Sequence, residues 1–309
     1  MIRPVRQMRP GGRVVCVGDV MLDISAALPG PLALGSDTPA TISFCHGGSA
    51  ANTAAWLASL AVPCVFAGRV GDDPFGREAV TALRAHGVIP RVSIDPATAT
   101  GICLVLVGPD GERTMVPSAG ANATLSPTDL GEDLLTAEDH LHLSGYALLN
   151  PGSRPAALFA LRLADSVGAS VSVDAASAGP IRSVGAQRFL DWIAPGAVLL
   201  ANADELAALT GADGADGVDQ DAGLAALVAR HLTVVLKRGS AGSVLATAAG
   251  RWRCAAEPAQ VRDTTGAGDA FAAGLLAARW AGAELSEALG QANRLGAAAV
   301  ARIGGRPNP

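Results

Sequence analysis

The chain has 309 residues, of which 50% are hydrophobic and 4% aromatic, and its formal net charge at pH 7 is -5. This length and apolar content are sufficient for one large or two ordinary folded domains. The acidic balance and the scattered basic residues argue against a nucleic-acid-binding surface, and no apolar run reaches the roughly 20 residues that a membrane-spanning helix needs.

Residues 1–12 combine several arginines with Pro and Gly and lack the apolar stretch of a signal peptide, so we expect a flexible tail there. One domain then covers residues 13–309. The five cysteines are odd in number and widely separated, without a C-x-x-C pair. This usage is typical of buried thiols in a reduced, cytoplasmic protein.

Short β-branched runs alternate with Ala/Leu-rich stretches at helical spacing along most of the chain. Strands are predicted at 14–17, 62–66, 170–173, 198–200 and 234–237. Helices are predicted at 49–60, 74–86, 155–167, 204–209, 223–231, 270–280 and 285–301. The alternation predicts an α/β fold with a mostly parallel sheet and helices on both of its faces.

Two segments, 24–45 and 91–118, interrupt this alternation. The strand-like run 102–107 leads into Pro109-Asp110-Gly111-Glu112, a sequence typical of a hairpin turn. We therefore predict a small β element outside the main sheet.

Four of the predicted strands end at a polar residue or within two residues of one: Asp19, Asp174, Asn202 or Lys237. In open α/β sheets, ligands bind beyond the carboxyl ends of the strands. We therefore expect these four side chains to line one cleft, although each of them alone could equally be a helix cap or a turn residue.

The stretch D-T-T-G-A-G-D at 263–269 precedes an Ala/Leu-rich helix. Glycines at a helix start expose backbone N–H groups, which together with the helix dipole favour an anion. A carboxylate beside such an anion site suits a base that takes the proton of a hydroxyl attacking a phosphoryl group. The alternative interpretation is a glycine turn with Asp269 as a helix cap.

Motifs of other nucleotide-binding, hydrolytic or metal-binding sites are absent or incomplete in the sequence. The sequence has no P-loop, its G-x-G at 266–268 lacks the third glycine of a dinucleotide site, and the glycines at 47–48 lack the hydrolase elbow. His140 and His142 share one face of a strand, but no further ligand lies near them in the sequence. We interpret this pair as structural rather than metal-binding.

From residue 14 to residue 307 the chain resembles the ribokinase-like (PfkB) carbohydrate kinase family. The matching segments are G-D-V-M-L-D at 18–23, G-G-S-A-A-N at 47–52, G-R-V-G-D-D-P-F-G at 68–76 and the 263–269 stretch. The resemblance implies a three-layer α/β/α fold in which the β element is a lid. It also implies an ATP-dependent kinase that phosphorylates a hydroxyl of a small sugar-like molecule, using Mg²⁺ and sometimes K⁺, and a homodimer formed through the lid.

The same resemblance implies a role for each matching residue. The catalytic group comprises Asp269 as base and Gly266, Ala267 and Gly268 as anion hole. The substrate would bind to Asp23, Gly47, Gly48 and Asn52. The nucleotide would bind to Asn202, Lys237, Gly239, Gly242, Thr264 and Asn293, and Glu205 would position Mg²⁺ through water. The monovalent-cation loops of potassium-activated members correspond to Asp263, Thr265, Ala299, Arg302, Gly304 and Asn308.

Two departures argue against ribose specifically, because ribokinases have Lys where this chain has Ser49 and often Asn where it has Met21. A nucleoside kinase of the same family is an alternative, although aromatic residues for base stacking are few. A phosphosugar kinase would need an extra basic residue, with Arg113 and Arg154 as candidates. A non-catalytic sugar sensor is a further alternative, but it would not need Asp269.

Overall fold

The computed structural model describes residues 8, 11–109, 113–211, 219–230 and 232–308. Most of the tail predicted at 1–12, and the turn residues 110–112, lie outside these ranges. The strands are β1 (Val14–Val17), β2 (Met21–Ala27), β3 (Thr41–Gly47), β4 (Cys64–Gly71), β5 (Ile89–Asp95), β6 (Gly101–Val107), β7 (Arg113–Ser118), β8 (His140–Ser144), β9 (Ser170–Asp174), β10 (Val198–Asn202), β11 (Thr233–Lys237), β12 (Ser243–Thr247) and β13 (Gly250–Cys254).

The helices alternate with these strands. They are α1 (Ser49–Ser59), α2 (Pro74–Ala85), α3 (Pro127–Leu130), α4 (Gly145–Leu149), α5 (Arg154–Val167), α6 (Ala178–Val184), α7 (Ala186–Trp192), α8 (Ala203–Thr210), α9 (Gln220–Ala229), α10 (Ala267–Trp280) and α11 (Leu285–Val300), with 3₁₀ turns η1 (Gly120–Thr124) and η2 (Gly239–Ala241). Within the described ranges, no helix is long and apolar enough to span a bilayer.

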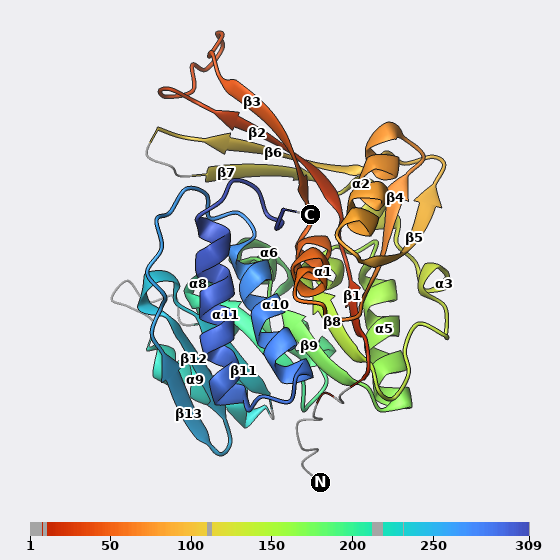
Figure 1. Cartoon of the computed structure of the whole chain (residues 1–309), viewed down its shortest axis with the longest axis vertical. Helices are drawn as coiled ribbons and strands as arrows, with labels where there is room; N and C mark the ends of the chain where they lie inside the picture. The colour runs from red at the N-terminus through yellow and green to blue at the C-terminus, as the bar shows by residue number, and fades with distance from the viewer. Residues whose placement is uncertain (1–7, 9–10, 110–112, 212–218, 231, 309) are drawn as a thin grey trace.

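Among the described residues, nine strands form the main sheet in the order β13-β12-β11-β10-β9-β8-β1-β4-β5. The strands from β11 to β5 are parallel, and β12 and β13 add an antiparallel hairpin at one edge. One hydrophobic core packs α5, α8 and α9 on one face, and two others pack α1, α2, α10 and α11 on the opposite face (Figure 1). The predicted three-layer α/β/α fold is confirmed.

A second sheet, β3-β2-β6-β7, forms the lid above the main sheet (Figure 1). Two boundaries differ from the prediction. The lid includes residues 21–23 and 46–47, and it does not include 91–95, which belong to β5 of the main sheet. The reason is that β4, α2 and β5 form one βαβ unit, whose last strand returns to the edge of β4.

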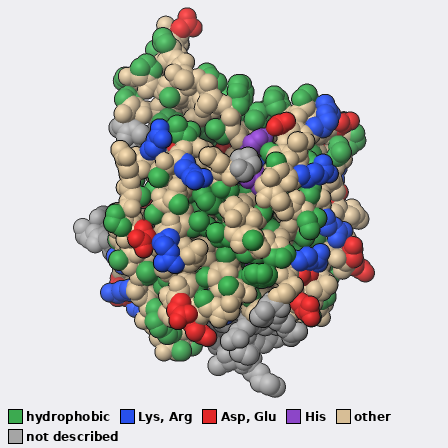
Figure 2. Space-filling view, in the orientation of Figure 1, with side chains coloured by type: hydrophobic (Ala, Val, Ile, Leu, Met, Phe, Trp, Pro, Cys, Tyr) green, Lys and Arg blue, Asp and Glu red, His purple; other side chains and the backbone are tan. Residues whose placement is uncertain are grey.

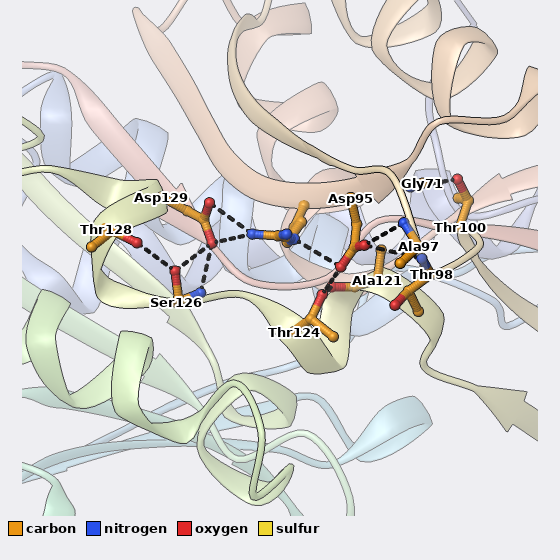
Figure 3. A network of polar contacts seen from close by, with 11 residues as sticks. Gly71, Asp95, Ala97, Thr98, Thr100, Ala121, Thr124, Ser126, Thr128 and Asp129 are labelled. Atoms are coloured by element: carbon orange, nitrogen blue, oxygen red, sulfur yellow. Dashed lines mark hydrogen bonds and ion pairs between the residues drawn. The ribbon is translucent and has the colours of Figure 1, made fainter.

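A buried polar network fixes the point where the chain leaves the main sheet for the lid (Figure 3). The Asp95 carboxylate, at the end of β5, accepts hydrogen bonds from Thr124 Oγ1 (2.6 Å), from Arg69 Nε (3.2 Å) and from two N–H groups of the following turn. These hydrogen bonds, above all that from Thr124, lower the pKa of Asp95 to about 2. Arg69 also binds Asp129. The base of the lid is therefore held by an ionised cluster.

Every predicted strand and helix overlaps an observed one, but β4 extends to Gly71, five residues past its predicted end. The hairpin β12–β13 and the short helices α3, α4, α6 and α7 are not among the predicted elements. Helices of four to seven residues are too short to show a clear helical period in sequence.

Candidate active site

A cavity of about 710 Å³ lies under the lid, at the carboxyl ends of the parallel strands. Asp19, Asp174, Asn202 and Lys237 all line it. The last three end the adjacent strands β9, β10 and β11, and Asp19 follows β1. This confirms the prediction that the polar strand ends form one cleft.

Asp269 lies in the first turn of α10 and faces this cavity. Its Oδ1 accepts a hydrogen bond from Ser49 Oγ (2.8 Å), and its Oδ2 accepts one from Asn52 Nδ2 (2.9 Å). Burial raises the pKa of Asp269 to about 7, although the two hydrogen bonds act in the opposite direction. The carboxylate is therefore oriented by α1 and poised to exchange a proton near neutral pH.

Two glycines keep the start of α10 open. Gly266 has a φ of 71°, and a Cβ there would lie 2.5 Å from Gly305 Cα, so a side chain does not fit. A Cβ on Gly268 would lie 3.2 Å from Lys237 Nζ. Both glycines line the cavity, whereas the N–H of Ala267 between them donates to Thr264 O at 3.3 Å.

The predicted substrate residues Asp23, Gly48 and Asn52 also line the cavity. The absence of a side chain at Gly47 leaves room for the Asp23 carboxylate, because a Cβ on Gly47 would lie 2.2 Å from Asp23 Oδ1. Burial and the neighbouring Asp19 carboxylate raise the pKa of Asp23 to about 6. The structure therefore places this predicted set together, next to Asp269.

Glu205 and Asn202 form a capping box at the start of α8, in which Asn202 N and Nδ2 both donate to the Glu205 carboxylate at 2.8 Å. Burial raises the pKa of Glu205. Beside it, Lys237 Nζ donates to Asp174 Oδ2 (2.7 Å). Asp174 and Glu205 together raise the pKa of Lys237, against the effect of burial. With Thr264, these groups line the second half of the cavity.

Three residues predicted to bind the nucleotide do not line the cavity. Gly239 begins the turn η2 after Lys237 and Gly242 follows it, and neither is among the residues that line the cavity. Asn293 is buried, and its Nδ2 donates to the carbonyls of Cys254 (3.3 Å) and Ala255 (2.8 Å). Its amide N–H groups therefore brace the segment after β13.

The predicted cation loops also approach each other. Gly304 N donates to Asp263 Oδ2 (2.8 Å), and Thr265 N donates to Asp263 Oδ1 (2.8 Å). The other predicted members of these loops are differently placed: Ala299 is buried, Arg302 lies with its guanidinium 5.7 Å from the ring centroid of Trp56, and Asn308 is exposed.

Two further residues, Arg306 and Ser49, shape the site although no role was predicted for them. Arg306 is buried and donates from Nε to Asn52 Oδ1 (3.1 Å) and from Nη2 to Gly47 O (2.8 Å). Ser49 was noted only as a departure, yet it binds Asp269. Signals existed for both, since Ser49 lies inside a matching segment and Arg306 within the cation-loop region.

The two basic candidates for a phosphosugar site are both engaged elsewhere. Arg154 donates to the carbonyls of Leu148 (2.7 Å) and Leu149 (3.1 Å) and lies over the Trp192 ring. Arg113 Nη1 forms an ion pair with Asp263 Oδ1 (2.7 Å). Neither arginine lines the cavity.

His140 and His142 are buried in β8 and hydrogen-bond to serines of the neighbouring strand β9, His140 to Ser170 and Ser172 and His142 to Ser172. Burial lowers the pKa of His140 to about 3 and that of His142 to about 4. Among the described residues, no group of three or more His, Cys, Asp or Glu could hold a metal ion. The structural interpretation of this pair agrees with these contacts.

Comparison with known proteins gives consistent matches. The ATP-dependent ribose-1-phosphate kinase of Halopiger xanaduensis is 35% identical over 269 residues, which cover 85% of this chain and 83% of that protein. A fructokinase of Klebsiella pneumoniae is 34% identical over 86% of this chain and 84% of its own length. The crystal structure of adenosine kinase from Sinorhizobium meliloti has a TM-score of 0.84 at 27% identity and matches over 96% of both chains.

The family model of the pfkB carbohydrate kinases matches residues 12–309, nearly the whole chain. The match includes both motifs that meet in the cavity, the segment around Asn52 and the segment that ends at Asp269. The chain therefore belongs to the pfkB family of carbohydrate kinases, which phosphorylate sugars with ATP.

Proposed function

We propose that this kinase phosphorylates a hydroxyl of a neutral, unphosphorylated sugar and that Asp269 is its catalytic base. The observation that carries the proposal is the charge of the acceptor side of the cavity. Asp19, Asp23 and Asp269 all face it, and Asp19 Oδ1 has no hydrogen-bond partner among the described residues, although Asp19 is largely buried (9% exposed). Such a surface offers acceptors to hydroxyl groups and repels a phosphate.

The basic residues point the same way. Among the described residues that line the cavity, only Lys237 is basic, and it is paired with Asp174 on the side away from Asp23. The name of the Halopiger relative raises ribose 1-phosphate as an acceptor. The cation near these carboxylates, Arg306, is buried behind the cavity lining and is held by Asn52 and Gly47, so three carboxylates and one guanidinium would face that phosphate.

On the opposite side, we assign the ATP phosphates to the region of Lys237 and the amides of Gly266 and Gly268. The oxygens of Asp174, Asn202 and Glu205 lie there but already accept hydrogen bonds, so these residues would hold Mg²⁺ through its water shell. Hard oxygen donors in small number fit Mg²⁺, which keeps several waters and binds chiefly to nucleotide phosphates. Bound Mg²⁺ would neutralise charge on the transferred phosphoryl group.

The residues then divide the transfer among themselves. Asp23 and Asn52 orient the acceptor so that one hydroxyl lies next to Asp269, which takes its proton as the oxygen attacks the γ-phosphorus. The bond from that phosphorus to the ADP oxygen breaks, and the amides at the start of α10 stabilise charge on the migrating group. The lid excludes water, which would otherwise compete as the acceptor.

A riboside is the second candidate, favoured by the apolar inner wall of the cavity. Cys103, Met115 and Pro117 of the lid line the cavity, and so does Tyr146. This wall could hold a neutral base attached to the sugar. The similarity to an adenosine kinase structure agrees with that option.

An acceptor panel tests both candidates. ADP release is measured with fructose, ribose, adenosine and ribose 1-phosphate at saturating Mg-ATP. We expect the best neutral acceptor to exceed ribose 1-phosphate by roughly 100-fold in kcat/KM, since several carboxylates oppose the phosphate. Asp23→Ala should raise the KM of the acceptor and leave that of ATP unchanged. A preference for ribose 1-phosphate would refute the neutral-acceptor proposal.

We also propose a homodimer formed through the outer face of the lid. Strand residues alternate between faces, so Phe44, Leu104 and Val116 point away from the cavity that Cys103, Met115 and Pro117 line. Phe44 is 67% exposed and pairs in register with Ile24, next to Leu104. Figure 2 shows hydrophobic side chains along the lid at the top of the molecule.

Sedimentation velocity tests the dimer. We expect a dimer for the natural chain and a monomer for Phe44→Glu, because the substitution puts a charge into the apolar row. Phe75→Glu is the matched control, since Phe75 is also exposed (44%) but lies on α2, outside the lid. A natural chain that sediments as a monomer at micromolar concentration would exclude this interface.

A further inference from the structure

The lid reaches the loop in front of the anion hole through one arginine. Arg113, the first residue of β7, forms an ion pair with Asp263 (Nη1 to Oδ1, 2.7 Å) and a hydrogen bond with Thr265 Oγ1. The two charged side chains are only 12% and 18% exposed. They join residues that lie 150 positions apart in the sequence.

The carboxylate of Asp263 accepts three hydrogen bonds in this arrangement. Oδ1 accepts from Thr265 N and from Arg113, and Oδ2 accepts from Gly304 N. Burial alone would raise the pKa of Asp263, but the N–H groups of Gly304 and Thr265 and the charge of Arg113 lower it. The negative charge of this loop is therefore already balanced by a guanidinium.

A monovalent cation does not fit beside such a pair. Potassium at this position would take Asp263 as its negatively charged ligand, and it would then lie next to a second full positive charge in a partly buried site. The predicted ligands also have other roles, since Ala299 O accepts from Arg302 N (3.1 Å). The donor set predicted for K⁺ therefore disagrees with the contacts that these residues make.

We infer that Arg113 takes the place of the monovalent cation. From the lid, its guanidinium fixes Asp263 and Thr265, and through them the backbone that leads to Gly266 and the anion hole. Arg113 is thus a positioning residue for phosphoryl transfer. Because it lies on the lid, the loop is fully held only when the lid covers the cavity, and the kinase needs no potassium.

The test compares KCl with tetramethylammonium chloride at constant ionic strength, in the natural chain and in Arg113→Gln. For the natural chain we expect the same turnover in both salts, within about twofold. Arg113→Gln should lose roughly 10- to 100-fold in kcat without K⁺, as expected when a positioning contact is lost, and should regain most of it in K⁺. Arg91→Gln is the control, because Arg91 forms an exposed pair with Asp133 and should gain no response to K⁺.

A melting experiment without substrates gives a second readout, which stays informative whichever sugar is the acceptor. Arg113→Gln should melt several degrees higher in K⁺ than in tetramethylammonium, whereas the natural chain should show no difference. Activation of the natural chain by K⁺ of several-fold would overturn the inference. So would an Arg113→Gln variant that loses activity but responds to K⁺ in neither experiment, since Arg113 would then only fasten the lid.

Discussion

The pH dependence of the reaction gives a direct test of Asp269, with Ser49→Ala as the perturbation. Burial raises the pKa of Asp269 to about 7, while the Ser49 hydroxyl, at 2.8 Å, stabilises the charged form. A base acts only when it is deprotonated. We therefore expect kcat/KM for the acceptor to fall about tenfold for each pH unit below this value and to level off above it.

The size of the change follows from the lost hydrogen bond. A hydrogen bond to a charged group contributes about 1.5–3 kcal/mol, and one pKa unit corresponds to about 1.4 kcal/mol. Water in the cavity can partly replace the hydroxyl of Ser49, so we take the lower end and expect the midpoint to rise by about one unit. At pH 6 the Ser49→Ala variant should then have about one-tenth of the natural kcat/KM, and at pH 9 nearly the same value.

The assay is coupled ADP release from pH 5.5 to 9.5 at saturating Mg-ATP, with the coupling enzymes in excess at each pH. Ser166→Ala is the matched control, because this exposed hydroxyl bonds only to the Leu163 carbonyl of its own helix. A natural profile that is flat from pH 5.5 to 8, or a Ser49→Ala profile that superimposes on it, would refute the assignment of Asp269.

Three further variants test neighbouring parts of the site. Asp269→Asn should lower turnover by a factor of about 10²–10⁴. Because the pKa of Asp269 is raised in the folded state, the folded natural chain binds more protons than the unfolded chain, and its stability falls as the pH rises from about 4 to 7. The variant should therefore have a higher melting temperature than the natural chain at pH 8 but not at pH 4. Gly268→Ala places a Cβ 3.2 Å from Lys237 Nζ and should lower kcat roughly tenfold without lowering the melting temperature. Arg306→Met removes two hydrogen bonds that hold Asn52 and Gly47, and titrations should show the KM of the acceptor rising roughly tenfold while that of ATP stays unchanged.

The sequence predicts the main sheet and the catalytic end of α10 well, because both depend on local patterns. Buried parallel strands are continuous apolar runs, and the glycines around Ala267 mark a helix start with open amides. The polar residue at each strand end needs only the rule that ligands bind at carboxyl ends. Asp19, Asp174 and Lys237 could therefore be placed in one cleft before any coordinates were known.

The contacts that support the catalytic residues could not be predicted in this way. Arg306 reaches Asn52 across 254 positions, and Arg113 reaches Asp263 across 150. No periodicity relates such distant residues, and the local sequence around an arginine does not show whether its side chain is exposed or buried. The boundary of the lid at β5 was wrong for a related reason, since the pairing partner of a strand is decided by tertiary packing.

The charges of the site explain why its acceptor side and its base belong together. Asp19, Asp23 and Asp269 lie around one cavity and outnumber the buried Arg306 whose charge acts on all three. Burial and like charges raise the pKa values of Asp23 and Asp269 to about 6 and 7. Hydroxyl groups of a neutral sugar would supply the donor that Asp19 Oδ1 lacks among the described residues, and donors to Asp23 would stabilise the ionised form of Asp23. Asp269 would then lie near a carboxylate that stays charged, so its affinity for the proton of the attacking hydroxyl would increase when the acceptor is bound. A phosphorylated acceptor would add negative charge to the same place without adding donors, and for that reason the arrangement that activates the base also selects against it.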